Sequence, residues 1–280
     1  MAERIRRIES HQARAGDPNL FLRGWHPEHP RRAVVLVHGF GEHSGRYDEF
    51  GSWLAESGCA VQGYDHRGHG RSGGEVGHVD RFEDYLNDLD SVLSDTHAAY
   101  PNLPLHLLGH SMGGLICAAY LAERTAPLVT AVLSAPALAA DAEPRHRVAG
   151  GRLLRMLRPR HRIASPVDPD ALSTDPAVVQ AYLDDPLVRH DRMTVSLALE
   201  LLAGMSLAVP EKIDTPTLVL HGDDDRICAP AISEAFAGGL PQGKQVRYPG
   251  LRHEILNEPS REEVYREILR WLETGETQSR

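Results

Sequence analysis

A serine between glycines stands where an apolar run gives way to a helical pattern. Leu105 to Leu108 leads into Gly109-His-Ser-Met-Gly113, with Ser111 at the centre. At a sharp corner between a strand and a helix, a strained serine holds its hydroxyl out at the carboxyl edge of the sheet, and flanking glycines avoid collisions with the neighbouring strand and helix. The spacing therefore predicts Ser111 as a nucleophile, and the N–H of Met112 as a donor to the oxyanion that would form.

A serine hydroxyl is a poor nucleophile at neutral pH, so a histidine base and an acid that orients this base are expected later in the chain. Three aspartates, Asp223 to Asp225, follow the apolar run Thr217 to Leu220. The acid must project back towards the edge of the sheet, so Asp225 is favoured and Asp223 is the alternative. His253 is the predicted base because it follows a short strand pattern and is the only histidine after His221. In this chain order, each partner lies on a loop after a late strand.

A second oxyanion donor is expected in the glycine-rich loop that follows Ala33 to Val37. His38-Gly39-Phe40 begins this loop, and the N–H of Phe40 is the predicted partner of the Met112 N–H. His38 and Gly39 also fit ordinary turn geometry. A role in the turn and a role in the oxyanion site are compatible, because the expected oxyanion donor is a backbone N–H of the loop.

Strand and helix patterns alternate around these residues, which predicts an α/β fold. Such alternation gives a parallel sheet with right-handed crossovers and helices on both faces. An antiparallel edge hairpin is expected around Leu20 to Trp25. Further elements are predicted as strands at Ala33 to Val37, Ala60 to Tyr64, Leu105 to Leu108, Val129 to Ser134, Thr217 to Leu220 and Gln245 to Tyr248, and as a closing helix at Arg261 to Leu272.

The alternation stops after Ala135-Pro136 and resumes near Thr217. Between Ala139 and Val209 the chain has short helical patterns broken by prolines and no clear buried strand. We expect a helical cap at residues 139–209, over the carboxyl edge of a core formed by residues 1–138 and 210–280. Substrate is expected to contact cap residues within this range, at positions that the sequence does not single out.

Composition narrows the class of protein. The 280 residues are 41% apolar and 25% charged, as in an ordinary globular protein, and the net charge of −9 argues against a nucleic-acid binder.

No run approaches the roughly 20 apolar residues of a membrane span, and Met1 to Glu9 lacks the apolar core of a signal peptide, so a cytoplasmic location is expected. Three widely spaced cysteines and 16 scattered histidines predict neither a disulfide framework nor a metal site, and no cofactor is expected.

Several longer motifs resemble the monoacylglycerol lipase branch of the α/β-hydrolase family, especially its bacterial members. The motifs are His38-Gly-Phe-Gly-Glu-His-Ser-Gly-Arg-Tyr47, Asp65-His-Arg-Gly-His-Gly-Arg-Ser72, Gly109-His-Ser-Met-Gly-Gly114, Leu133-Ser-Ala-Pro136, residues 175–188, His221-Gly-Asp-Asp-Asp-Arg226 and Tyr248-Pro-Gly-Leu-Arg-His-Glu254. The resemblance implies an α/β-hydrolase fold, with a mostly parallel eight-stranded sheet and an inserted cap. It also implies that Asp225 is the acid and that Phe40 and Met112 are the oxyanion donors.

The same resemblance implies a serine esterase that cleaves monoacylglycerols to fatty acid and glycerol through an acyl-serine intermediate. A lysophospholipase, a general carboxylesterase or a proline-type aminopeptidase on the same fold is the enzymatic alternative. The non-enzymatic alternative is a lipid-binding protein that kept the fold without catalysis. The presence of Ser111, Asp225 and His253 argues against it.

A run of arginines in the expected cap has two interpretations. Long basic side chains interleaved with apolar ones suit an anionic lipid surface, which predicts peripheral contact with a membrane. Alternatively, the arginines pair with Glu143, Asp168 or Asp170 on a solvated helix. The run consists of Arg145, Arg147, Arg152, Arg155, Arg158, Arg160 and Arg162.

Overall fold

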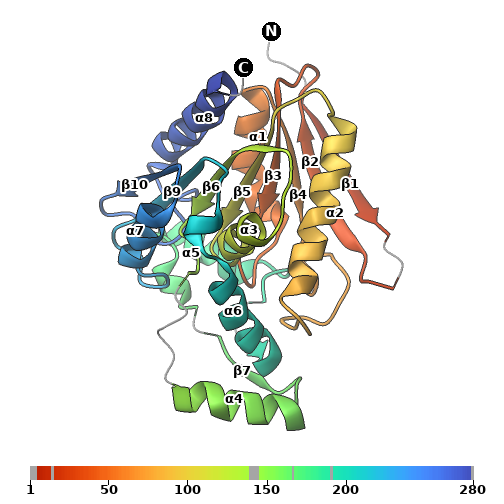
Figure 1. The fold of residues 1–280 in the computed structure, drawn as a ribbon, viewed down its shortest axis with the longest axis vertical. Helices are drawn as coiled ribbons and strands as arrows, with labels where there is room; N and C mark the ends of the chain where they lie inside the picture. The colour runs from red at the N-terminus through yellow and green to blue at the C-terminus, as the bar shows by residue number, and fades with distance from the viewer. Residues whose placement is uncertain (1–4, 14–15, 139–144, 166, 190–191, 279–280) are drawn as a thin grey trace.

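The computed structural model describes residues 5–13, 16–138, 145–165, 167–189 and 192–278. Its centre is an eight-stranded sheet with the order β1-β2-β4-β3-β5-β6-β9-β10 (Figure 1). The strands are β1 (Arg6–Gln12), β2 (Leu20–His26), β3 (Arg32–Val37), β4 (Cys59–Tyr64), β5 (Leu105–His110), β6 (Leu128–Ser134), β9 (Thr217–Gly222) and β10 (Gly243–Tyr248). The predicted α/β class is confirmed, and each predicted strand is present with one or two additional residues at its ends.

The strand pairing brings the predicted loops to one edge of the sheet. β2 is antiparallel to β1 and β4, which confirms the edge hairpin, and the remaining strands pair in parallel. In this register Val37 of β3 lies opposite Gly109 of β5, and His110 lies opposite Ser134 of β6. Since parallel strands end at the same edge, the loops after β3, β5, β9 and β10 lie together there.

Helices cover both faces of the sheet, as the alternation predicts (Figure 1). α1 (Asp48–Glu56) and α8 (Arg261–Gln278) contribute to the core on one face, and α2 (Glu83–Ala99), α3 (Met112–Glu123) and α7 (Pro230–Gly239) to the core on the other. Neighbouring strand residues divide between the two cores: Val34 belongs to the first and Val35 to the second. Such strands are apolar throughout because both faces are buried.

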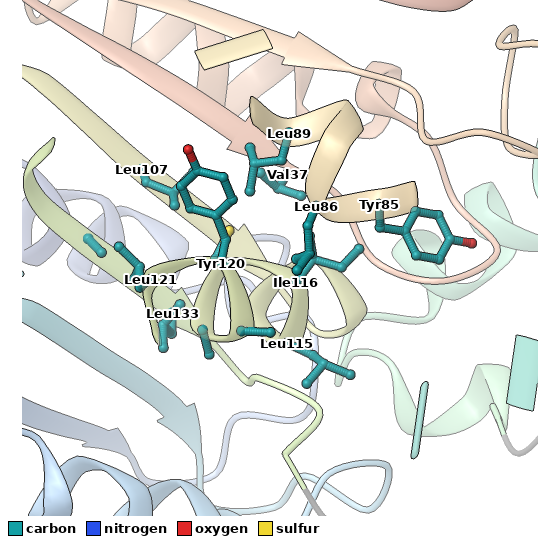
Figure 2. Packing of buried hydrophobic residues seen from close by; sticks show 14 of the residues in the cluster. Val37, Tyr85, Leu86, Leu89, Leu107, Leu115, Ile116, Tyr120, Leu121 and Leu133 are labelled. Atoms are coloured by element: carbon teal, nitrogen blue, oxygen red, sulfur yellow. The ribbon is translucent and has the colours of Figure 1, made fainter. Parts of the chain in front are cut away.

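α3, the helix that follows Ser111, lies at the centre of the second core. Figure 2 shows Leu115, Ile116 and Tyr120 of this helix among side chains from α2 and the central strands. Its residues from Met112 to Leu121 are all buried, which explains a sequence that is apolar on every side. The tight packing fixes the amino-terminal end of α3, and with it the corner at Ser111.

The described residues between β6 and β9, here called the inserted segment, form a separate layer. They comprise α4 (Arg145–Leu157), β7 (Arg162–Ala164), η2 (Pro169–Ala171), α5 (Pro176–Asp184), β8 (Arg192–Thr194) and α6 (Val195–Leu207), followed by η3 (Pro210–Lys212). α6 packs on α3, and α4 packs on α6 at the end of the molecule farthest from the sheet (Figure 1). Ala139, the predicted start of the cap, lies outside the described residues.

One feature of the inserted segment differs from the prediction of helices alone. β7 and β8 form a short antiparallel pair in which Ile163 lies opposite Met193. Strands of three residues are too short to show the alternating pattern by which a strand is detected. No helix among the described residues has the length and apolar character needed to cross a bilayer.

Candidate active site

Ser111 occupies the sharp corner between β5 and α3. Its φ of 52° and ψ of −117° lie outside the regions that non-glycine residues favour. Such strain persists only where surrounding contacts hold it. Here the Ser111 N–H donates to the Ser134 carbonyl at 3.0 Å, and the Ser111 carbonyl accepts the N–H groups of Leu115 and Ala137 at 3.0 and 3.1 Å. The structure therefore holds Ser111 in the strained conformation that the motif implies.

The two glycines beside Ser111 permit close backbone approach. A Cβ on Gly113 would lie 2.2 Å from the Val37 carbonyl oxygen and 2.5 Å from that of His38. A Cβ on Gly109 would lie 2.5 Å from the carbonyl oxygen of Gly113 and 2.6 Å from the sulfur of Cys117. Any side chain at Gly113 would push α3 away from the loop after β3, so this glycine brings the two predicted oxyanion donors near each other.

His253 and Asp225 are in direct contact at the carboxyl edge of the sheet. His253 Nδ1 lies 2.7 Å from Asp225 Oδ2, and both residues are buried. An ionised carboxylate only accepts hydrogen bonds, so Nδ1 carries the hydrogen and Nε2 is left as the basic nitrogen. Asp225 Oδ1 accepts the N–H groups of Ile227 and Cys228 at 2.8 and 3.0 Å. Burial acts to raise the pKa of Asp225, but hydrogen bonds from His221 and His253 hold this pKa well below its ordinary value.

The alternative acid, Asp223, is engaged elsewhere. Its Oδ1 forms an ion pair with Arg247 Nε at 2.6 Å, and its N–H donates to the carbonyl of Tyr248. Asp224 is exposed. Of the three consecutive aspartates, the structure therefore brings Asp225 to His253.

A second histidine, His221, also contacts Asp225 and is missed by the sequence-based prediction. Its Nε2 lies 2.8 Å from Asp225 Oδ2, and its Nδ1 lies 2.8 Å from Ser233 Oγ. In the sequence His221 is the first residue of a turn-like motif, which gives no sign of where its ring lies. The one feature of the sequence that could indicate this contact is the spacing of four residues between His221 and Asp225.

Contacts link Ser111 to the loop that carries the acid. The backbone N–H of Cys228 donates to Asp225 Oδ1 at 3.0 Å, and the Ser111 side chain is near enough to the Cys228 thiol to act on its pKa. On the other side, the ring of His110 lies 4.9 Å from the ring of His253, centre to centre. The structure thus brings Ser111, Asp225 and His253 to one edge from three separate loops.

The loop after β3 lies beside Ser111. A Cβ on Gly39 would lie 3.2 Å from Ser111 Cβ, and the Gly39 N–H donates to Glu42 Oε1 at 2.6 Å. Met112 is the first residue of α3, so its N–H has no partner within the helix. In the described part of the chain, neither this N–H nor that of Phe40 is paired with a protein acceptor. Both are therefore available to an oxyanion.

A buried ion cluster behind this loop was also missed from the sequence. Arg46 contacts Glu254 through both terminal nitrogens, at 2.5 and 2.9 Å, and contacts Glu42 at 3.1 Å. Its guanidinium also lies over the ring of Tyr182 from α5. Burial acts to raise the pKa of Glu254, yet the charge of Arg46 lowers it to about 2. Burial raises the pKa of Glu42, and the charge of Arg46 opposes this rise without cancelling it.

Glu258 ties the inserted segment to the loop of His253. This fully buried carboxylate accepts the hydroxyls of Ser173 and Thr174 at 2.9 and 2.5 Å, and the N–H of Arg252 at 2.8 Å. Next to it, the N–H of Glu254 donates to the carbonyl of Leu172 at 2.8 Å. The part of the inserted segment near residue 173 is therefore anchored to the core beside His253.

The remaining histidines near the edge hold loops together. His38 Nε2 accepts the backbone N–H of His66 at 2.9 Å, and His66 Nε2 donates to the carbonyl of His38 at 2.9 Å. Burial lowers the pKa of His38, so this ring stays neutral and can accept. His69 packs between His38 and Phe40. These contacts join the loops after β3 and β4.

The arginine run of the inserted segment divides into anchored and exposed members. Arg155 pairs with Glu200 and Arg160 with Glu75, each at 2.5 Å. These partners differ from the expected Asp168 and Asp170, and Glu143 lies outside the described residues. Arg160 is itself exposed, as are Arg152 and Arg158 of the same run.

The chain is similar to known proteins in both sequence and structure. Residues 28–260 match the family described as serine aminopeptidase, S33. The chain is 36% identical over 274 residues to the monoacylglycerol lipase of Mycolicibacterium smegmatis, covering 95% of this chain and 97% of that protein. It is 30% identical to phospholipase YtpA of Bacillus subtilis, over 86% of this chain and 95% of that protein. The crystal structure of Paleococcus ferrophilus monoacylglycerol lipase matches with a TM-score of 0.82 at 34% identity, covering 91% of this chain and 99% of that one.

Proposed function

Since the chain belongs to the S33 family of serine hydrolases and is a monoacylglycerol lipase-like α/β-hydrolase, we propose that it cleaves monoacylglycerols to fatty acid and glycerol. The observation that carries this proposal is the contact of Asp225 with His253 at the edge where Ser111 is strained. The names of two full-length relatives supply the substrate class.

The proposed reaction passes through an acyl-enzyme on Ser111. His253 Nε2 takes the serine proton as Oγ attacks the ester carbonyl, and Asp225 stabilises the imidazolium that forms. The N–H groups of Phe40 and Met112 donate to the tetrahedral oxyanion. Its collapse breaks the ester C–O bond, and His253 protonates the departing glycerol oxygen. The same nitrogen then deprotonates a water, which attacks the acyl-serine and releases the fatty acid.

We assign residues 139–209 as a cap that contributes the acyl-binding surface. Leu172, Tyr182 and Val188 of the inserted segment form an apolar cluster with Ile227 of the acid loop. Ile227 follows Asp225 by two residues, so this cluster brings apolar surface from the cap close to the proposed acid. Apolar side chains with a few polar groups are the usual lining of a site for a lipid ester.

The test of the reaction uses Ser111→Ala, with Ser57→Ala as a control at a serine far from the site. Wild-type protein is expected to release glycerol from a monoacylglycerol and to react with a fluorophosphonate probe. Ser111→Ala is expected to lose turnover by more than about 10⁴-fold, since nucleophile and base act as a unit. Undiminished hydrolysis by Ser111→Ala would contradict the mechanism, and absence of both labelling and turnover in the wild type would favour a lipid-binding protein.

A substrate panel separates the enzymatic alternatives. Monoacylglycerols are compared with a lysophospholipid, a short p-nitrophenyl ester and a peptide with amino-terminal proline. The similarity to phospholipase YtpA is the observation that keeps a lysophospholipase as the second candidate. The proposed function requires the highest kcat/KM on the monoacylglycerol.

We propose in addition that α4 contacts an anionic lipid surface. Leu153, Met156 and Leu157 are 60%, 82% and 74% exposed on this helix, and Arg152 and Arg158 are exposed beside them. Apolar side chains framed by arginines fit the boundary between headgroups and acyl chains. Together with free cysteines, which persist in a reducing compartment, this supports a cytoplasmic enzyme with peripheral membrane contact.

The membrane proposal is tested by sedimentation with vesicles. Binding is expected to anionic vesicles and to fall with added salt, and the triple change Leu153→Ser, Met156→Ser and Leu157→Ser is expected to abolish it. Leu183→Ser is the matched control, because Leu183 is also exposed but lies on α5. Equal sedimentation with neutral and anionic vesicles would rule the proposal out.

A further inference from the structure

The carboxylate of Asp225 has two histidines on one oxygen. Asp225 Oδ2 lies 2.7 Å from Nδ1 of His253 and 2.8 Å from Nε2 of His221. The proposed reaction uses His253 and gives His221 no role. Yet His221 is fully buried in β9 and directly contacts the proposed acid.

The partners of His221 fix the ring nitrogen that carries hydrogen. Nε2 faces two acceptors, Asp225 Oδ2 and the carbonyl of Cys228 at 3.0 Å, so Nε2 must be the donor. Nδ1 lies 2.8 Å from Ser233 Oγ, whose hydroxyl can donate to it. The ring is therefore satisfied at both nitrogens, as a donor to Asp225 and an acceptor from α7.

We propose that His221 is a positioning residue, which holds Asp225 Oδ2 in place for His253. The inference rests on the proposed function. A carboxylate rotates about its bond to Cβ, and the N–H groups of Ile227 and Cys228 fix only Oδ1. The N–H of His221 fixes the other oxygen, Oδ2, which also accepts the hydrogen bond from His253.

This role has a specific kinetic consequence. His253 gains a proton in both chemical steps, and a misplaced Asp225 would stabilise that imidazolium less well. His221 is fully buried, so we expect substrate binding to be unchanged by its substitution. Loss of one hydrogen bond to a charged group is expected to lower kcat by about 10- to 100-fold, with KM within about twofold of wild type.

The test compares His221→Gln with His221→Asn in the full chain. A glutamine amide reaches the position of Nε2 and can still donate to Asp225, whereas an asparagine amide reaches only the position of Nδ1, beside Ser233. With p-nitrophenyl butyrate, and per active site titrated by a fluorophosphonate, we expect Gln to keep kcat within about threefold and Asn to lose about 10- to 100-fold. Equal kcat in the two variants, or a larger loss with Gln, would overturn the inference.

The matched control is His106→Asn. His106 is also a buried histidine with a hydroxyl on Nδ1, that of Thr130 at 2.8 Å, but it lies near the start of β5. Its kcat per titrated site is expected to equal that of wild type. If the His221 variants do not fold, NMR of labelled histidine in the wild type decides: hydrogen on Nε2 of His221 is required, and hydrogen on Nδ1 alone would overturn the inference. A wild type without turnover or labelling would contradict the proposed function instead.

Discussion

Arg46 and Glu254 join the loop after β3 to the loop that carries His253. The two-point ion pair between them is shielded from solvent, with 9% and 4% of the two side chains exposed. Through Glu42, the same arginine reaches the N–H of Gly39. One cation therefore connects the predicted oxyanion loop with the residue next to the predicted base.

Arg46→Met is expected to destabilise the fold by about 3–5 kcal/mol, because it leaves two buried carboxylates without their cation. Urea unfolding measures the change. Arg266→Met is the control, since its ion pair with Glu262 on α8 is exposed and should contribute at most about 1 kcal/mol. Arg46→Lys keeps the positive charge but cannot contact Glu254 through two nitrogens, so it should recover part of the lost stability. Equal stability of Arg46→Met and Arg266→Met would contradict this interpretation.

Buried neutral histidines should make the fold sensitive to mild acid. Burial lowers the pKa of His106 and of His110 to about 3. In the unfolded chain a histidine titrates near about 6.5, so the unfolded state binds more protons below that pH, and stability falls as the pH falls. The stabilising difference is largely present above about pH 6.5, and these two residues alone would cost roughly 3 kcal/mol between pH 6.5 and 5.

The measurement is urea unfolding at a series of pH values. The slope of the unfolding free energy against pH gives the number of protons taken up on unfolding. His106→Asn should lower this number by about one in this range. A stability that stays constant or rises from pH 7 to 5 would show that these rings are not neutral in the folded state.

Much of the fold follows from local patterns. The apolar runs of β3, β5 and β9 are buried on both faces, so each is recognisable without knowledge of its partners. The residues predicted from the glycine-serine corner and from the ends of late strands lie on one edge because parallel strands end together. Local sequence is sufficient where strand periodicity and turn chemistry decide the position.

The supporting contacts could not be predicted in this way. Arg46 meets Glu254, and Glu258 meets Ser173, across large separations in the chain, and neither pair has a period or a spacing to mark it. His221 belongs to a turn-like motif whose ring direction depends on α7, through Ser233. Such pairings arise only when loops from different elements are packed together, so they require the tertiary structure.

The thiol of Cys228 should react slowly with maleimide at neutral pH. Burial raises its pKa and the charge of Asp225 raises it further, while the side chain of Ser111 acts in the opposite direction. Because the thiolate is the nucleophile, alkylation is expected to be at least about tenfold slower than for free cysteine, and to accelerate at high pH. Cys59 and Cys117 are fully buried, so Cys228→Ala should abolish the remaining slow labelling of the folded protein. Labelling as fast as that of free cysteine would contradict the raised pKa.

Gly113→Ala tests whether the approach of α3 to β3 positions the predicted oxyanion donors. The added methyl group would lie 2.2 Å from the Val37 carbonyl oxygen, so α3 must shift and carry the Met112 N–H away from the loop of Phe40. We expect a loss of about 1–3 kcal/mol in urea unfolding, and a fall in kcat of at least about tenfold per titrated active site. Gly150→Ala on α4 is the matched control. A Cβ there meets nothing within 4 Å, so the helix should gain up to about 1 kcal/mol with kcat unchanged. If Gly113→Ala kept full kcat in its folded fraction, the spacing between α3 and β3 would matter for stability alone, and the assignment of Met112 as a donor would have to be abandoned.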